Sequence, residues 1–183
     1  MEELRQTKEA THQQHLWHDD LMDTYGLEMT KLAYTYVKNW STAQDIVQDV
    51  FVKAYHNYSK REKLHSVRGW LIRLTINQSK DYLKSSWFRR VTGLDSKHST
   101  ETTQSAEDTL TTNSSNAQLS QAVLALKQDY REVIFLYYYE ELTVREMSEV
   151  LKVKEATLHT RLRRAKMELH HQLKGEDFVW GTN

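Results

Sequence analysis

The sequence predicts an all-α fold of two small helical domains joined by a flexible linker. The 183 residues include no proline and only five glycines, so residues that end helices are scarce. Apolar residues recur at three- and four-residue steps through most of the chain, which is the spacing of one helix face. The stretch 91–117 lacks this pattern and is rich in Ser, Thr and Asn, so we expect it to be the linker.

The composition excludes several classes of protein. The absence of cysteine excludes disulfides, thiolate catalysis and zinc sites built from cysteine. No apolar run approaches the roughly 20 residues that a membrane helix needs, and the polar N-terminus lacks the apolar core of a secretion signal. We therefore expect the protein to act in the cytoplasm.

Residues 1–15 are predicted to form an N-terminal tail with loose helical structure. His12, His15 and His18 follow at three-residue steps and would share a helix face, which allows a metal site on paper. No carboxylate pattern or fourth ligand completes the geometry of such a site. We expect a solvent-facing histidine stripe, with no metal and no cofactor.

The first domain is predicted to span 16–90. Its first element, 16–37, is an amphipathic helix or a pair of helices joined near Gly26. Ser41 is a candidate cap for the next helix, 41–58. The apolar face of that helix consists of Ile46, Val47, Val50, Phe51 and Ala54.

The charge is unevenly distributed although the net charge is zero. Residues 1–58 hold five basic and nine acidic side chains (−4), whereas 59–90 hold nine basic and two acidic ones (+7). In the acidic part, Asp45, Gln48 and Asp49 share the polar face of the second helix. This face is either an ordinary solvated surface or a docking site for a basic partner.

The most basic element is a helix predicted over 67–90, which follows a short basic loop, 59–66. One side of this helix carries Val67, Trp70, Leu71, Leu74 and Gln78, and its apolar members are predicted to pack on neighbouring helices. Basic side chains on another side would neutralise phosphates, and aromatic rings among them would stack on exposed bases. The pattern indicates binding to a nucleic-acid strand. The alternative is a solvated helix whose Trp and Leu residues are ordinary core.

The second domain is predicted over 118–174, with a C-terminal tail at 175–183. A first helical pattern includes Leu119, Val123, Leu126, Val133, Ile134 and Tyr137, with a bend at about 127–130. Thr143 and Glu146 then have the spacing of a capping box, which starts a short helix. A longer basic helix follows, and its inner side consists of Leu158, Leu162, Ala165 and Leu169. A short helix, a turn and a basic second helix make a helix-turn-helix.

The outer side of this last helix carries the residues that would contact DNA. They are His159, Thr160, Arg163 and Arg164, with Arg161 and Lys166 on the flanks. In a major groove the outer residues would meet base edges and the flanking ones phosphates. The alternative is a basic surface helix in a bundle.

Three segments resemble the extracytoplasmic-function class of bacterial RNA polymerase sigma factors. AQDIVQDVFVKAYHNY looks like the family's polymerase-binding helix, and VRGWLIRLTINQSKDYLK resembles its promoter-melting segment. YREVIFLYYYEELTVREMSEVLKVKEATLHTRLRRAKMEL is similar to its final helix-turn-helix. The resemblance covers 16–90 and 118–173, and the three motifs occur in the family's order.

The resemblance implies a role for each group of residues. Asp45, Gln48 and Asp49 match the residues that face the coiled coil of the polymerase's largest subunit. Melting and recognition of the proximal promoter element would fall to Arg68, Trp70, Arg73, Asn77, Lys80, Tyr82 and Lys84. The preceding loop, 59–65, matches the family's pocket-forming loop, which varies among members, and contributes Lys60, Arg61, Lys63 and His65. The distal promoter element would be read by His159, Thr160, Arg161, Arg163, Arg164 and Lys166.

The resemblance also implies partners: core RNA polymerase, promoter DNA and an inhibitory anti-sigma factor, which can be membrane-anchored. We expect no small-molecule substrate and no enzymatic activity, because no nucleophile-base pairing, phosphate loop or metal spacing is present. Two other hypotheses are a stand-alone duplex-binding regulator and a helical interaction protein whose basic faces are merely solvated.

The chain departs from the family pattern at three positions. Lys152 stands in the turn where the family usually has glycine, which requires a left-handed backbone there. Gln128 or a neighbour replaces a frequent proline, and Arg163 replaces an aromatic residue or histidine. These differences affect the base preference more than the fold.

Overall fold

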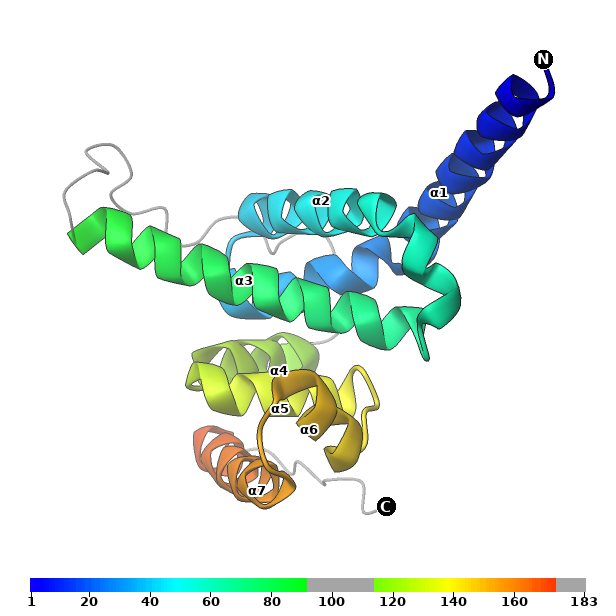
Figure 1. The fold of residues 1–183 in the computed structure, drawn as a ribbon. Helices are drawn as coiled ribbons and strands as arrows, with labels where there is room; N and C mark the ends of the chain where they lie inside the picture. The colour runs from blue at the N-terminus through cyan, green and yellow to red at the C-terminus, as the bar shows by residue number, and fades with distance from the viewer. Residues whose placement is uncertain (92–113, 174–183) are drawn as a thin grey trace. The chain divides into compact units, whose positions relative to one another are not determined.

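The computed structural model describes residues 1–91 and 114–173, and both ranges are helical (Figure 1). The elements are α1 (Glu2–Val37), α2 (Trp40–His56), the 3₁₀ segment η1 (Tyr58–Lys63), α3 (Val67–Val91), α4 (Ser114–Ala125), α5 (Gln128–Tyr138), α6 (Val144–Leu151) and α7 (Glu155–Gln172). The chain divides into two compact units, with the boundary between Thr102 and Thr103. The prediction of an all-α fold with two helical regions is confirmed.

Most of the predicted linker, residues 92–113, and the predicted C-terminal tail lie outside the described residues. The linker was expected to extend to residue 117, but α4 begins at Ser114. A helix with a packed apolar face can extend over polar residues when no proline or glycine stops it. None of the described helices is both long and apolar enough to cross a bilayer.

The first unit is built from α1, α2 and α3, which pack on one another. Its fully buried side chains include Met29, Leu32, Val50, Leu71, Ile72 and Ile76, and all three helices contribute to this core. α1 is a single continuous helix, so the alternative of two helices joined near Gly26 is wrong. Its first turns, in dark blue, extend beyond the other two helices (Figure 1), although residues 1–15 were expected to be a loosely helical tail.

Two details of the first unit differ from prediction. The cap of α2 is Asn39 rather than Ser41: the Asn39 Oδ1 accepts a hydrogen bond from the Thr42 N–H at 2.8 Å. Asn is as good an N-cap as Ser, and its position two residues earlier lets the helix begin at Trp40. The buried side of α3 is also rotated from the predicted one. It consists of Leu71, Ile72, Thr75, Ile76 and Ser79, whereas Val67, Trp70, Leu74 and Gln78 are partly exposed.

The second unit contains α4 to α7. The predicted bend is the break between α4 and α5, and Arg131 stabilises it. The buried Arg131 Nη1 donates to the carbonyl oxygens of Leu124 at 2.7 Å and Leu126 at 3.1 Å, where α4 ends. The last carbonyls of a helix have no partner in a following turn, so a guanidinium is a suitable cap at this helix end.

The helix-turn-helix has the predicted local structure. The Thr143 N–H donates to Glu146 Oε2 at 2.8 Å and the Glu146 N–H donates to Thr143 Oγ1 at 3.3 Å, which completes the capping box. Lys152 ends α6 in the left-handed conformation, with φ 57°. The predicted inner side of α7 is buried: Leu158, Leu162, Ala165 and Leu169.

Candidate nucleic-acid interface

The polar face of α2 presents three exposed side chains, Asp45, Gln48 and Asp49, here called the acidic patch. The opposite face of α2 is buried in the core, so packing on α1 and α3 fixes the direction in which the patch points. Asp49 is also held from α3, because the Gln78 Nε2 donates to its Oδ2 at 3.3 Å. The Lys53 Nζ in turn donates to Gln78 Oε1.

Val52 extends the acidic patch and was missed in the sequence. It lies three and four residues after Asp49 and Gln48, hence on the same helix face, and is 52% exposed. The sequence signal for Val52 is an apolar residue that follows Asp49 and Gln48 at helical spacing on the polar face. A single exposed apolar side chain is ordinary on a protein surface, so Val52 is counted with the patch because of its position on the same helix face.

α3 brings four of the predicted DNA-binding residues onto one line. Arg73, Asn77, Lys80 and Lys84 follow at steps of four, three and four residues, and are here called the α3 stripe. Arg73, Asn77 and Lys84 are exposed, whereas Lys80 is partly buried, with its Nζ 5.9 Å from the ring centre of Tyr36. The stripe lies opposite the buried side of α3.

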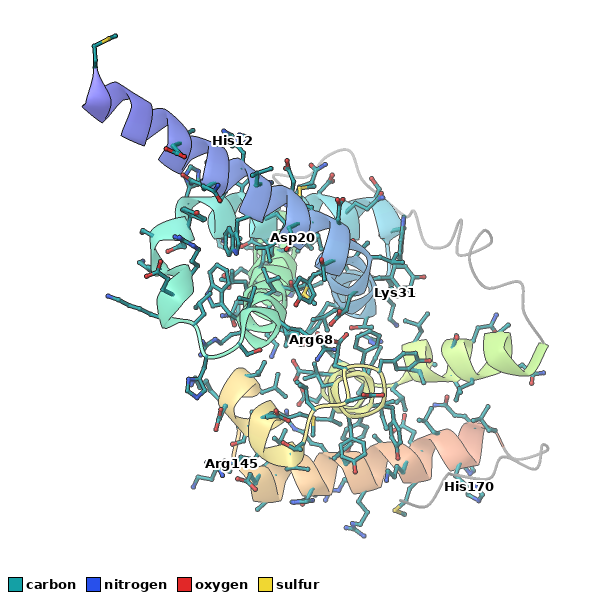
Figure 2. All side chains as sticks on the ribbon, turned by 90° about the vertical axis from the view of Figure 1, so that its right-hand side faces the viewer. His12, Asp20, Lys31, Arg68, Arg145 and His170 are labelled. Carbon is teal, nitrogen blue, oxygen red and sulfur yellow. The ribbon has the colours of Figure 1, made fainter. Side chains whose placement is uncertain are left out.

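Three other predicted residues of α3 do not share this line. Arg68 points to α1, where its Nε lies 2.7 Å from Glu28 Oε1, and Figure 2 labels it at the start of α3. At 100° per residue, Tyr82 lies on the side of α3 away from the stripe and is partly buried, and Trp70 is partly buried at its margin. The structure therefore separates residues that the family resemblance had grouped together.

The stripe continues into an exposed aromatic pair at the end of α3. Trp87 is 61% exposed and Phe88 57% exposed, and both lie within about 60° of the stripe on the helix. They line a shallow, open pocket together with Asp81, Leu83, Lys84 and Ser85. Trp87 and Phe88 are both among the aromatic rings expected on this helix, but they follow Lys84, the last of the predicted site residues, and were not predicted as part of the site.

The predicted loop residues lie in and after η1. Lys60 Nζ donates to Asn57 Oδ1 at 2.9 Å, and the Arg61 guanidinium lies 3.8 Å from the centre of the Tyr58 ring. Lys63 and His65 are exposed. The segment thus presents basic groups to solvent, and two of them are held by neighbouring side chains.

The outer side of α7 carries four exposed residues, His159, Thr160, Arg163 and Arg164, here called the α7 face. The two flanking residues are bound within their own unit. Arg161 Nη2 lies 2.9 Å from Asp129 Oδ2, and Lys166 Nζ lies 5.4 Å from the ring centre of Tyr138. Met167, 62% exposed, belongs to the same outer side and was missed.

Two of the three histidines predicted to form a stripe on α1 lie against an aromatic side chain. Among the residues that the structure describes, no three His, Cys, Asp or Glu side chains could hold a metal ion. His15 and His18 instead contact the ring of Tyr55, with ring centres 5.3 and 5.5 Å apart. His12 is exposed on the first half of α1 (Figure 2).

Two family models match the two units separately. Sigma-70 region 2 matches residues 21–89, which include the acidic patch, η1 and the α3 stripe, and Sigma-70 region 4 matches residues 116–169, which include the α7 face. The chain belongs to the extracytoplasmic-function class of the sigma-70 family. It is therefore a sigma factor, which recognises promoters for initiation by RNA polymerase and is not an enzyme.

Curated relatives agree with this assignment. The ECF RNA polymerase sigma factor SigW of Bacillus subtilis is 27% identical over 164 residues, which cover 85% of this chain and 88% of SigW. RNA polymerase sigma factor YlaC of the same organism is 28% identical over 158 residues, covering 82% of this chain and 88% of YlaC. The stand-alone regulator and the interaction protein are thus set aside as alternatives for this sigma factor.

Solved structures share the fold. The sigma factor RpoE of Bartonella quintana, in a co-crystal structure with the anti-sigma factor NepR, has a TM-score of 0.67 at 18% identity and covers 86% of this chain and 98% of its own. CnrH, in complex with the cytosolic domain of CnrY, has a TM-score of 0.60 at 23% identity and covers 87% of this chain and 88% of its own.

Proposed function

We propose that this sigma factor divides promoter recognition among three surfaces. The acidic patch binds the coiled coil of the polymerase's largest subunit, the α3 stripe and η1 contact the melted proximal element, and the α7 face reads the distal element. The observation that carries the proposal is that the acidic patch, the α3 stripe and the α7 face each lie on a helix whose opposite side is buried. Arg68, Trp70, Tyr82, Arg161 and Lys166 act in this proposal mainly by supporting these surfaces.

The chemistry of each surface suits its target. Arg73 and Lys84 neutralise phosphates along a single strand, and Asn77 between them offers donors and acceptors to a base edge. Arg163 and Arg164 can each donate two hydrogen bonds to a guanine in a major groove. Opening the duplex costs a few kcal/mol for each unstacked base, a cost that binding to the large polymerase helps to offset.

The acidic patch is tested by charge reversal. We expect Asp45→Arg with Asp49→Arg to reduce the affinity for core polymerase at least about tenfold, because each reversal replaces an attraction to a basic partner by repulsion. Asp20→Arg is the matched control, since Asp20 is an exposed carboxylate on α1 (Figure 2). Fluorescence titration of labelled sigma factor with core polymerase gives both affinities. Equal affinities for the wild type and the double variant would reject this role of the patch.

We also propose that an anti-sigma protein binds and inhibits this sigma factor. We propose that the sigma factor acts in the cytoplasm, because the polymerase works there. The support is the presence of exposed apolar side chains beside the charged surfaces, Val52 by the acidic patch and Trp87 and Phe88 by the α3 stripe. The test is affinity purification of the tagged full chain from its own cells while its promoters are silent. A co-purified protein that blocks binding to core polymerase in vitro supports the proposal. Sigma factor that purifies alone from such cells and binds core polymerase without further treatment contradicts it.

A further inference from the structure

The N-terminal half of α1 contacts η1 through residues that precede the range matched by the region 2 model, which begins at residue 21. Trp17, partly buried on α1, lies against Tyr58, the first residue of η1. The two ring centres are 5.4 Å apart and the ring planes are inclined by 63°, an edge-to-face contact. Tyr58 also lies under the Arg61 guanidinium, and the Arg61 Nη1 donates to the Tyr58 carbonyl oxygen at 3.3 Å. Trp17, Tyr58 and Arg61 therefore form one continuous row of contacts.

Neighbouring residues hold this part of α1 against the end of α2. The Gln14 Nε2 donates to the Tyr55 carbonyl oxygen at 2.8 Å. His18 presents its ring to Phe51 and Tyr55 in edge-to-face contacts, with ring centres 6.3 and 5.5 Å apart. With these contacts on both sides of it in the sequence, Trp17 has a defined position from which to support Tyr58.

η1 depends on such support because it has little packing of its own. It is a six-residue 3₁₀ segment in which no residue is buried. Short 3₁₀ segments have poorer hydrogen-bond geometry than α-helices and gain little stability from the backbone. Contacts with residues outside η1 therefore contribute strongly to its conformation, and the most important of them is the contact of Tyr58 with Trp17.

We infer that Trp17 is a positioning residue for promoter recognition: it fixes Tyr58, and through Tyr58 the guanidinium of Arg61, and so sets the base preference of η1. This inference rests on the proposed role of η1 at the proximal promoter element. An edge-to-face aromatic contact is worth enough to change a preference between bases by about two- to tenfold.

The experiment measures base preference with holoenzyme assembled from core polymerase and the full sigma chain. Initiation is compared on promoters that carry each of the four bases at each position of the proximal element, and in parallel at the distal element. The variants are Trp17→Ala, Trp17→Leu, Trp17→Phe and Arg61→Ala, and Leu16→Ala is the control because the neighbouring Leu16 is 49% exposed. Trp17→Leu keeps apolar volume but removes the ring, so the test remains valid if Trp17→Ala fails to fold.

We expect Trp17→Ala and Trp17→Leu to reduce the preference for the best proximal base about two- to tenfold, as Arg61→Ala does. Trp17→Phe should retain most of the preference, and no variant should alter the distal preference. If Arg61→Ala changes the proximal preference and the Trp17 variants do not, η1 reads the promoter but the inference is overturned. If neither changes it, the proposed role of η1 fails and the inference fails with it. An equal loss on all promoters would mean a purely structural role for Trp17, which also overturns the inference.

Discussion

At the scale of single residues, two arginines two positions apart on α7 have different environments. Arg163 is exposed on the outer side, whereas the side chain of Arg161 is only 24% exposed and pairs with Asp129 and with the buried Glu132. Helical periodicity placed Arg163 on the outer side and Arg161 on a flank, and both were predicted to contact DNA. The sequence does not show that Asp129 and Glu132 lie beside that flank. Arg131, which caps α4, could not be found for the same reason.

This difference predicts two distinct phenotypes. Arg161→Ala should lower the free energy of unfolding of the second unit by about 1–3 kcal/mol, because it leaves the buried Glu132 carboxylate without this partner. Arg163→Ala, the matched control on the same helix, should change stability by less than about 0.5 kcal/mol and weaken DNA binding instead. Urea unfolding followed by circular dichroism measures the first effect and promoter binding by holoenzyme the second. Equal stability of the two variants would contradict the assignment of Arg161 to the interior.

At the scale of elements, predictions were most accurate for features that depend on residues only a few positions apart in the sequence. The capping box of α6, the left-handed Lys152 and the buried side of α7 were all predicted and are confirmed. α3 shows the limit of this reasoning, because its buried side includes Thr75 and Ser79, both 0% exposed. Thr75 satisfies its hydroxyl by donating to the Leu71 carbonyl oxygen at 2.9 Å, an arrangement that hydrophobic periodicity cannot detect.

The turn of the helix-turn-helix offers a prediction at this scale. A left-handed conformation costs a residue with a side chain about 1–2 kcal/mol, and Lys152 has this conformation at φ 57°. Lys152→Gly relieves this cost but increases the conformational entropy of the unfolded chain. The net effect should be a rise in the free energy of unfolding of about 0.5–1 kcal/mol. Lys154→Gly, two residues later at φ −59°, should give no such gain. A stability measurement in which Lys152→Gly is no better than Lys154→Gly would show that the turn is not strained.

At the scale of the whole molecule, two separately packed units present three exposed surfaces on one chain. The division into two helical regions followed from composition alone, because a polar stretch without large apolar residues cannot form a core. The residues that make each surface required the structure, which grouped Arg73, Asn77, Lys80 and Lys84 and placed Arg68 against Glu28. The covalent link between the units makes the second DNA contact effectively intramolecular once the first has formed, so binding of both elements is stronger than either alone.

The central claim is that the α3 stripe and the α7 face read different promoter elements, while the acidic patch binds the polymerase. The most direct measurement is initiation by holoenzyme carrying either Asn77→Ala or Arg163→Ala with Arg164→Ala, on promoters altered in one element at a time. We predict that the first variant loses sensitivity to changes in the proximal element only, that the second loses sensitivity to changes in the distal element only, and that both bind core polymerase as the wild type does. A variant that loses sensitivity to both elements equally, or that binds core polymerase more weakly, would contradict the claim.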